Sequence, residues 1–231
     1  MSGEFSGFSK DFMAFFKELK ANNNRDWFAE NKQRYKDVVQ YPISDFIAAL
    51  APHLEDIAPY YVADPRPNRG SMFRIYRDVR FSKDQRPYKE HAACQFRHQA
   101  GKDAHAPGFY IHLENDKVRF GGGVYMPPAP KLSLIREAID ESPEKWLGII
   151  EDPEFIEIFG EVNGAALKRP PKGYPADHPL IEHLKRKSFF IMHEIPAKRM
   201  HSKKLVEDVA STYQKAVPFM RFLTNAVELP F

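Results

Sequence analysis

The stretch FYIHLENDKVRF, residues 109–120, decides the fold that we expect. Apolar and polar side chains alternate along it on both sides of Asn115-Asp116, two residue types that favour turns. Alternation of this kind is typical of two antiparallel strands that have one apolar and one polar face. The stretch therefore predicts a β-hairpin in an antiparallel sheet.

Other parts of the chain show the same two-residue period. Residues 73–76 and 92–96 alternate upstream of the hairpin, and a further strand is expected at residues 188–195. In the first of these runs, Arg74 and Tyr76 would lie on the polar face of the sheet. We therefore expect an antiparallel sheet of about four to five strands.

Helical patterns lie on both sides of this sheet segment, which spans residues 70–126. In residues 8–58, apolar side chains recur every three or four positions, and the triplet Asn22–Asn24 interrupts them. Residues 130–228 are again mainly helical in pattern, and Pro218 is expected to kink or break the last helix. We predict an α+β fold in which N-terminal and C-terminal helices flank a central antiparallel sheet.

The length of 231 residues fits one domain, residues 1–231. Hydrophobic residues make up 43% of the chain and aromatic residues 13%, which is enough to form a core and excludes intrinsic disorder. No apolar run reaches about 18 residues, and the first residues do not resemble a signal peptide. The single cysteine, Cys94, excludes an intramolecular disulfide. We expect a cytoplasmic protein that has no membrane partner.

Charge is distributed unevenly along the chain, although 34 basic residues nearly balance 31 acidic ones. Residues 66–119 hold 12 Lys and Arg against 6 Asp and Glu, and residues 166–204 hold 10 against 3. Between them, residues 137–161 hold 9 acidic residues and a single Lys. The basic segments either pair with the acidic one inside the chain or form a positive surface.

The densest group of basic and tyrosine side chains follows the first predicted strand. Guanidinium groups bind carboxylate or phosphate through two parallel hydrogen bonds, and tyrosine hydroxyls add neutral donors. A lysine in the proline-rich loop 168–179 would close over the same anion. We therefore predict a basic pocket at the rim of the sheet that binds a phosphorylated or carboxylated small molecule. The predicted ligand-binding residues are Arg74, Tyr76, Arg77, Arg80, Lys83, Tyr88, Lys89 and Lys172.

Two other interpretations of the same residues stay open. The two basic segments, with the polar sheet face, could form a nucleic-acid or protein-interaction module whose binding would depend steeply on salt. Alternatively, the arginines pair with Asp78 and Asp84 in a purely structural network that holds a long connection and binds no ligand.

Catalytic chemistry has less support in the sequence, and whether the protein is an enzyme stays open. The polar sheet face presents Tyr110 and His112, which are the candidates for acid–base work. The histidines form no recognised metal motif, so no metal site is predicted. The glycines at 121–123 lack the residues that follow in a phosphate-binding or dinucleotide-binding loop, so no cofactor is predicted either. The three glycines indicate that another backbone segment packs closely against this strand. Alternatively, a ligand lies directly against the glycine backbone.

Four groups of motifs occur in one order along the chain: Asn22–Phe28 with Asn31-Lys32, Phe73–Lys83 with Pro87–Lys89, Gly121–Tyr125, and Arg169–Tyr174 with Lys185–Phe189. With these motifs the chain resembles the bacterial family of conserved proteins of unknown function called DUF2461, over about residues 5–225. Gln85 and Arg86 stand where family members commonly have Lys and Thr. The resemblance implies one intact domain in a bacterial cytosol, and it carries over no reaction, cofactor or catalytic residue.

Overall fold

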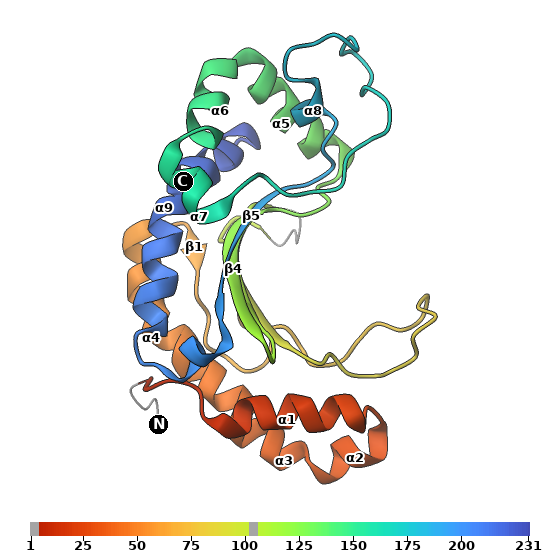
Figure 1. The fold of residues 1–231 in the computed structure, drawn as a ribbon, viewed down its shortest axis with the longest axis vertical. Coiled ribbons are helices and arrows are strands. Elements are labelled where there is room, and N and C mark those ends of the chain that lie inside the picture. The colour runs from red at the N-terminus through yellow and green to blue at the C-terminus, as the bar shows by residue number, and fades with distance from the viewer. Residues whose placement is uncertain (1–4, 102–105) are drawn as a thin grey trace.

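The structure, a computed structural model, describes residues 5–101 and 106–231 and has the predicted α+β fold (Figure 1). A five-stranded sheet lies at its centre, and each strand pairs antiparallel with the next along the chain. The hairpin at 109–120 is confirmed, since Leu113 pairs with Val118 on either side of the turn. The strands are β1 (Tyr61–Val62), β2 (Ala92–His98), β3 (Gly108–Leu113), β4 (Lys117–Val124) and β5 (Phe189–Pro196).

The predicted strand at 73–76 is wrong. These residues begin a long projection, residues 74–90, which we call the arm (Figure 1). Its two limbs pair with each other, because the Arg77 N–H donates to the Pro87 carbonyl and the Lys89 N–H to the Ile75 carbonyl. Alternation of apolar and polar side chains predicts an extended segment with two different faces, but it does not predict which other segment pairs with it. Arg74 and Tyr76 therefore leave the sheet. The residues just before them still pair with β2, because Met72 forms a bridge with Cys94 and the Phe73 N–H donates to the Ala93 carbonyl, while the strand beside β2 is β1.

The N-terminal helices are α1 (Lys10–Ala21), α2 (Arg25–Glu30), α3 (Lys32–Tyr35), the π-helical turn η1 (Lys36–Gln40) and α4 (Tyr41–Ile57). The predicted break at the asparagine triplet is confirmed. Asn22 ends α1, and the Asn24 side chain accepts from the Trp27 N–H at the start of α2. Asparagine suits both positions because its short amide can satisfy free backbone groups.

The C-terminal part contains α5 (Ala129–Glu141), α6 (Pro143–Ile150), α7 (Pro153–Phe159), α8 (Ile181–Leu184), the 3-10 turn η2 (Ala197–His201) and α9 (Leu205–Ala226). α6 and α7 both begin at a proline, which lacks the N–H that a helix start would leave unpaired. Of the kink or break expected at Pro218, the break does not occur, because α9 continues to Ala226. Buried neighbours such as Phe219 hold its second half against the core, and packing of this kind outweighs the lost hydrogen bond.

The core lies on one side of the curved sheet. α9 and α4 cover the convex face, while no helix of the described chain lies against the concave face in Figure 1. Tyr213 of α9 packs its ring 4.6 Å from that of Phe109 and donates its hydroxyl to the Tyr110 carbonyl at 2.9 Å. The convex face is apolar, and Cys94 and Phe120 on it are fully buried. The polar face is thus open.

The three glycines of β4 bring its backbone close to β5 and α9. A Cβ atom at Gly121 would lie 1.9 Å from the Ile191 carbonyl oxygen of β5. At Gly122 it would lie 2.5 Å from the Met220 sulfur of α9. Gly123 has φ +141°, a conformation that favours glycine. The expected close approach of backbones is therefore present, and it sets the curvature of the sheet at this point.

We expect Gly121→Ala to lower the free energy of unfolding by about 2 kcal/mol, since the added methyl group forces β4 and β5 apart. Gly148→Ala in α6 is the matched control, because a Cβ there meets nothing within 4 Å. That change should raise the stability by roughly 0.5–1 kcal/mol. Urea unfolding of both variants checks the expectation, and an unaffected Gly121→Ala protein would contradict it.

Candidate functional site

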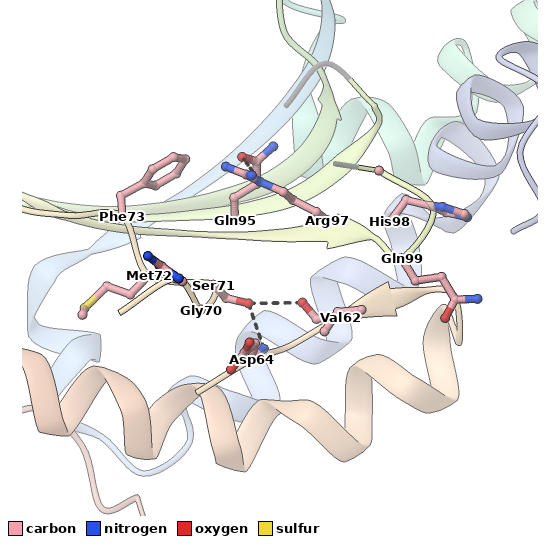
Figure 2. Close-up of a pocket in the computed structure, with 12 residues that line it drawn as sticks. Val62, Asp64, Gly70, Ser71, Met72, Phe73, Gln95, Arg97, His98 and Gln99 are labelled. Atoms are coloured by element: carbon pink, nitrogen blue, oxygen red, sulfur yellow. Dashed lines mark hydrogen bonds between the residues drawn. The ribbon is translucent and has the colours of Figure 1, made fainter. Parts of the chain in front are cut away.

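A pocket of about 230 Å³ lies at the β1–β2 edge of the sheet, where the chain leads into the arm (Figure 2). We call it the rim pocket. The Ser71 hydroxyl links the residues at the base of the pocket. It donates to the Val62 carbonyl at 3.1 Å and accepts from the Asp64 N–H at 2.9 Å. Gln95 and Arg97 rise from β2 on the opposite side, and Phe73 lies at one end (Figure 2).

Two arginines without a carboxylate partner line the rim pocket. Among the described residues, neither Arg69 nor Arg97 forms a salt bridge; the Arg97 Nε donates to the Gln95 amide oxygen at 3.2 Å. The carboxylate in the lining, Asp64, is already bound by Arg66, with 2.9 Å between Arg66 Nε and Asp64 Oδ2. That guanidinium holds the pKa of Asp64 below its usual value. Most guanidinium donors of Arg69 and Arg97 thus stay free for an anion.

The turn at 68–70 presents Arg69 to the pocket. Arg69 has a left-handed backbone with φ +65°, which is uncommon for a residue with a side chain. A Cβ at Gly70 would lie 2.3 Å from the Arg66 carbonyl oxygen, so only glycine fits beside it. The tight turn therefore holds Arg69 in a strained backbone conformation, and strained backbone of this kind often occurs at binding sites.

A second polar group lies on the concave face next to the rim pocket. The Tyr110 hydroxyl is 3.1 Å from His112 Nδ1, and His112 Nε2 is 3.4 Å from the Glu114 carboxylate. Arg119 donates to the same carboxylate at 2.8 Å. The His91 ring packs against the His112 ring at a tilt of 33°, with 4.2 Å between the centroids. We call these five residues the concave-face cluster.

The rim pocket and the concave-face cluster are continuous. Gln95 of β2 lies directly opposite Tyr110 of β3 in the sheet register. The Phe73 ring is 6.2 Å from the Tyr110 ring, so it borders both groups. A ligand in the pocket would therefore lie beside a hydroxyl and an imidazole.

Burial controls protonation in the concave-face cluster. Burial and, to a smaller extent, the neighbouring His112 together lower the pKa of His91 to about 4. Burial also lowers the pKa of His112 and raises the pKa of Tyr110 to about 12. At neutral pH both imidazoles are uncharged and the phenol keeps its proton. A neutral imidazole that contacts a hydroxyl at one nitrogen and a carboxylate at the other can accept or pass on a proton.

The arginines predicted to bind a ligand are mostly engaged with acidic residues of the arm. Arg77 forms a salt bridge to Asp84 at 2.9 Å, and Arg80 forms one to Asp78 at 2.7 Å. Arg74 is exposed, and no salt bridge of it is seen in the described chain. These contacts are those expected for the purely structural network of arginines and aspartates. Anion binding at these residues stays a prediction.

The other predicted ligand residues of the arm have different surroundings. Tyr88 is buried and stacks on Phe28 at 4.2 Å, while Tyr76 is half-exposed beside it. The Lys89 ammonium donates to the Arg74 carbonyl at 2.8 Å and lies 5.2 Å from the Phe73 ring. Among the predicted ligand residues, Lys89 therefore makes the contact closest to the rim pocket, since Phe73 lines that pocket.

Lys83 and Lys172 lie apart from the rest of the predicted set. Lys83 is exposed at the outer part of the arm. Lys172 belongs to the loop 168–179, which lies beside α8 at the opposite end of the molecule from α1 (Figure 1). The structure thus does not bring the eight predicted residues into one pocket.

A family model described as conserved hypothetical protein (DUF2461) matches residues 11–222. The chain belongs to this family. No curated protein and no solved structure matches the chain. The rim pocket, the concave-face cluster and the arm all lie inside the matched region.

The described residues of this DUF2461 protein contain neither a metal-binding cluster nor a membrane-spanning helix. No group of three or more His, Cys, Asp or Glu side chains in residues 5–101 and 106–231 could hold a metal ion. Within the same residues, no helix combines the length and apolar character needed to cross a membrane.

Sequence reasoning found Tyr110 and His112 but missed Arg69 and His91. Arg69 follows Asn68 and precedes Gly70, and this turn sequence was the available signal for a side chain held at a special backbone position. His91 lies just before β2, so alternation within the strand did not link it with His112 on β3. Only the strand pairing brings the two rings together.

Because its pKa is lowered by burial, His91 makes stability depend on pH. The unfolded chain binds a proton near pH 6.5 and the folded chain near pH 4, so the stability present above pH 6.5 is lost as the pH falls. We expect the free energy of unfolding to drop by about 1 kcal/mol between pH 7 and pH 5.5 through this group.

Urea unfolding of wild type and His91→Gln at the two pH values isolates this contribution. His91→Gln should show the smaller drop, whereas His53→Gln, which removes an exposed histidine of α4, should behave as wild type does. Equal drops in wild type and His91→Gln would show that His91 titrates normally in the folded protein.

Proposed function

We propose that this DUF2461 protein binds a small phosphorylated or carboxylated molecule in the rim pocket. The observation that carries the proposal is the pair Arg69 and Arg97, which line the pocket without a carboxylate partner among the described residues. In contrast, Arg77 and Arg80 of the arm are matched by Asp84 and Asp78.

The chemistry of the pocket suits a compact anion. Each hydrogen bond from a guanidinium to an anionic oxygen contributes about 1.5–3 kcal/mol, because one or both partners are charged. Gln95 adds an amide, and Phe73 forms an apolar wall against which a carbon skeleton can pack. The volume of about 230 Å³ limits the bound group to a small molecule or to one end of a larger molecule.

A second candidate function is an enzyme that acts on this ligand. It rests on the contact between Tyr110 and His112, because Tyr110 lies directly opposite Gln95 of the pocket in the sheet register and His112 follows two residues later on β3. In this function His112 exchanges a proton with the ligand through the Tyr110 hydroxyl, and Glu114 stabilises the imidazolium that forms. The reaction class would be a proton transfer beside the bound anion.

Thermal unfolding at fixed ionic strength tests the binding, with inorganic phosphate, sugar phosphates, nucleotides and dicarboxylates as probes. A ligand that binds only the folded state raises Tm, and about 2.7 kcal/mol of stabilisation is expected at a hundredfold excess over Kd. For a probe that raises Tm, Arg97→Ala should weaken binding by roughly 10- to 150-fold, the loss of one charge-assisted hydrogen bond. Arg69→Ala should act in the same direction.

Arg80→Ala is the matched control, since it removes an exposed arginine that already has a carboxylate partner. It should leave binding unchanged. If Arg80→Ala abolishes the shift and Arg97→Ala does not, the anion site is the arm, as the sequence predicts. If none of the small anions acts and oligonucleotides raise Tm in a salt-dependent way, the basic segments bind nucleic acid instead.

A further inference from the structure

The tip of the arm carries an aromatic side chain with almost no contacts. Phe81 is 96% exposed, more than any other large apolar residue in the described chain. Its flanks are basic, because Arg80 lies against its ring and Lys83 follows two residues later. An exposed phenylalanine on a projecting segment leaves a large apolar surface in water, and such residues often become buried against a partner.

A second pocket elsewhere on the chain has the size and lining for a phenyl ring. It has a volume of about 190 Å³ and lies between α6, α7 and α9; we call it the helical pocket. Ile149, Phe155, Pro218 and the bare backbone at Gly148 form its apolar part. An apolar cavity of about 150 Å³ binds benzene, so the volume of the helical pocket is large enough for a phenyl ring, with Asp152, Glu154 and Lys215 at its polar part.

The surroundings of the two features have opposite charges. The arm, residues 74–90, holds six basic and three acidic side chains. Residues 137–161, which include α6 and α7, hold nine acidic side chains and one lysine, and all nine acidic residues are exposed. Asp152 and Glu154 line the helical pocket itself, together with one basic residue, Lys215, whose ammonium lies 2.7 Å from the Glu154 carboxylate. Attraction between such surfaces speeds association and orients it.

The arm cannot reach the helical pocket of its own chain. It projects from the concave side of the sheet, while α6 and α7 lie beyond the other end of the sheet (Figure 1). The basic and acidic segments therefore do not satisfy each other within one molecule through this contact. A second copy of the chain carries the matching pocket and the matching charge.

We propose that the arm of one copy binds a second copy of this chain, with Phe81 in the helical pocket and Arg80 and Lys83 facing the acidic side chains around it. The contact joins two different surfaces, so each copy gives one arm and receives another. It uses neither the rim pocket nor the concave-face cluster, so the proposed anion binding does not depend on it.

Sedimentation velocity of the full chain over a concentration series tests the proposal with two variants. Phe81→Ala removes the inserted ring, and the fold should tolerate it because that side chain is exposed. Gly148→Leu fills the helical pocket from a position where a Cβ meets nothing within 4 Å. Wild type should associate with rising concentration, and either variant alone should stay monomeric. Tyr41→Ala, which removes a different exposed aromatic residue, should associate like wild type.

Mixing the two variants gives the sharpest result. Phe81→Ala keeps an intact pocket and Gly148→Leu keeps an intact arm, so the mixture should form one-to-one dimers that higher salt weakens. A symmetric interface elsewhere would not show this complementation. The proposal is overturned if wild type stays monomeric, if the mixture stays monomeric while wild type associates, or if Phe81 is needed only for binding an oligonucleotide.

Discussion

The packing of α9 against the convex face of the sheet is the interaction on which the rest of the structure depends. Tyr213 contacts Phe109 and donates to the Tyr110 carbonyl, and the missing side chain at Gly122 lets Met220 approach the β4 backbone. Burial of large aromatic side chains dominates the stability of cores of this kind. With α9 and α4 on one face, the sheet curves and leaves its other face to polar residues.

The open concave face follows from this one-sided core. Every second residue of β2 and β3 faces away from α9, which places Gln95, Tyr110 and His112 together on the opposite side. Neighbouring strands and the segment at Phe73 that leads into the arm half-bury these side chains, and no helix of the described structure covers them. Half-burial is enough to keep the two imidazoles neutral and still leave the rim pocket open to solvent.

The N-terminal helices position the arm. The Asn23 side chain donates to the Tyr88 carbonyl at 3.0 Å and accepts from the Tyr88 N–H at 3.1 Å. The Tyr88 ring also stacks on Phe28 of α2. These contacts join two of the motifs on which the sequence resemblance rests, the asparagine triplet and the arm. The base of the arm is therefore held firmly, while its tip at Phe81 projects free of the body.

The sequence by itself determined the order of elements, the α+β class, the hairpin at 109–120 and the family. Local patterns carry that information, because a two-residue or 3.6-residue period and a turn pair depend on near neighbours only. The sequence also placed Tyr110 and His112 on one polar face, since both belong to one strand. Tertiary structure alone decided that residues 73–76 join an arm, that α9 continues through Pro218, and that His91 packs against His112.

In the candidate site, too, the sequence predicts one part and the tertiary structure decides the rest. The sequence identifies a basic chain segment, but it does not show which arginines have acidic partners. Arg77 and Arg80 find theirs within a few residues, whereas Arg97 lies on a strand whose neighbours offer none. Which cations stay available for an anion depends on contacts between segments far apart in the chain, and only the folded arrangement of β1, β2 and the turn at Arg69 determines them.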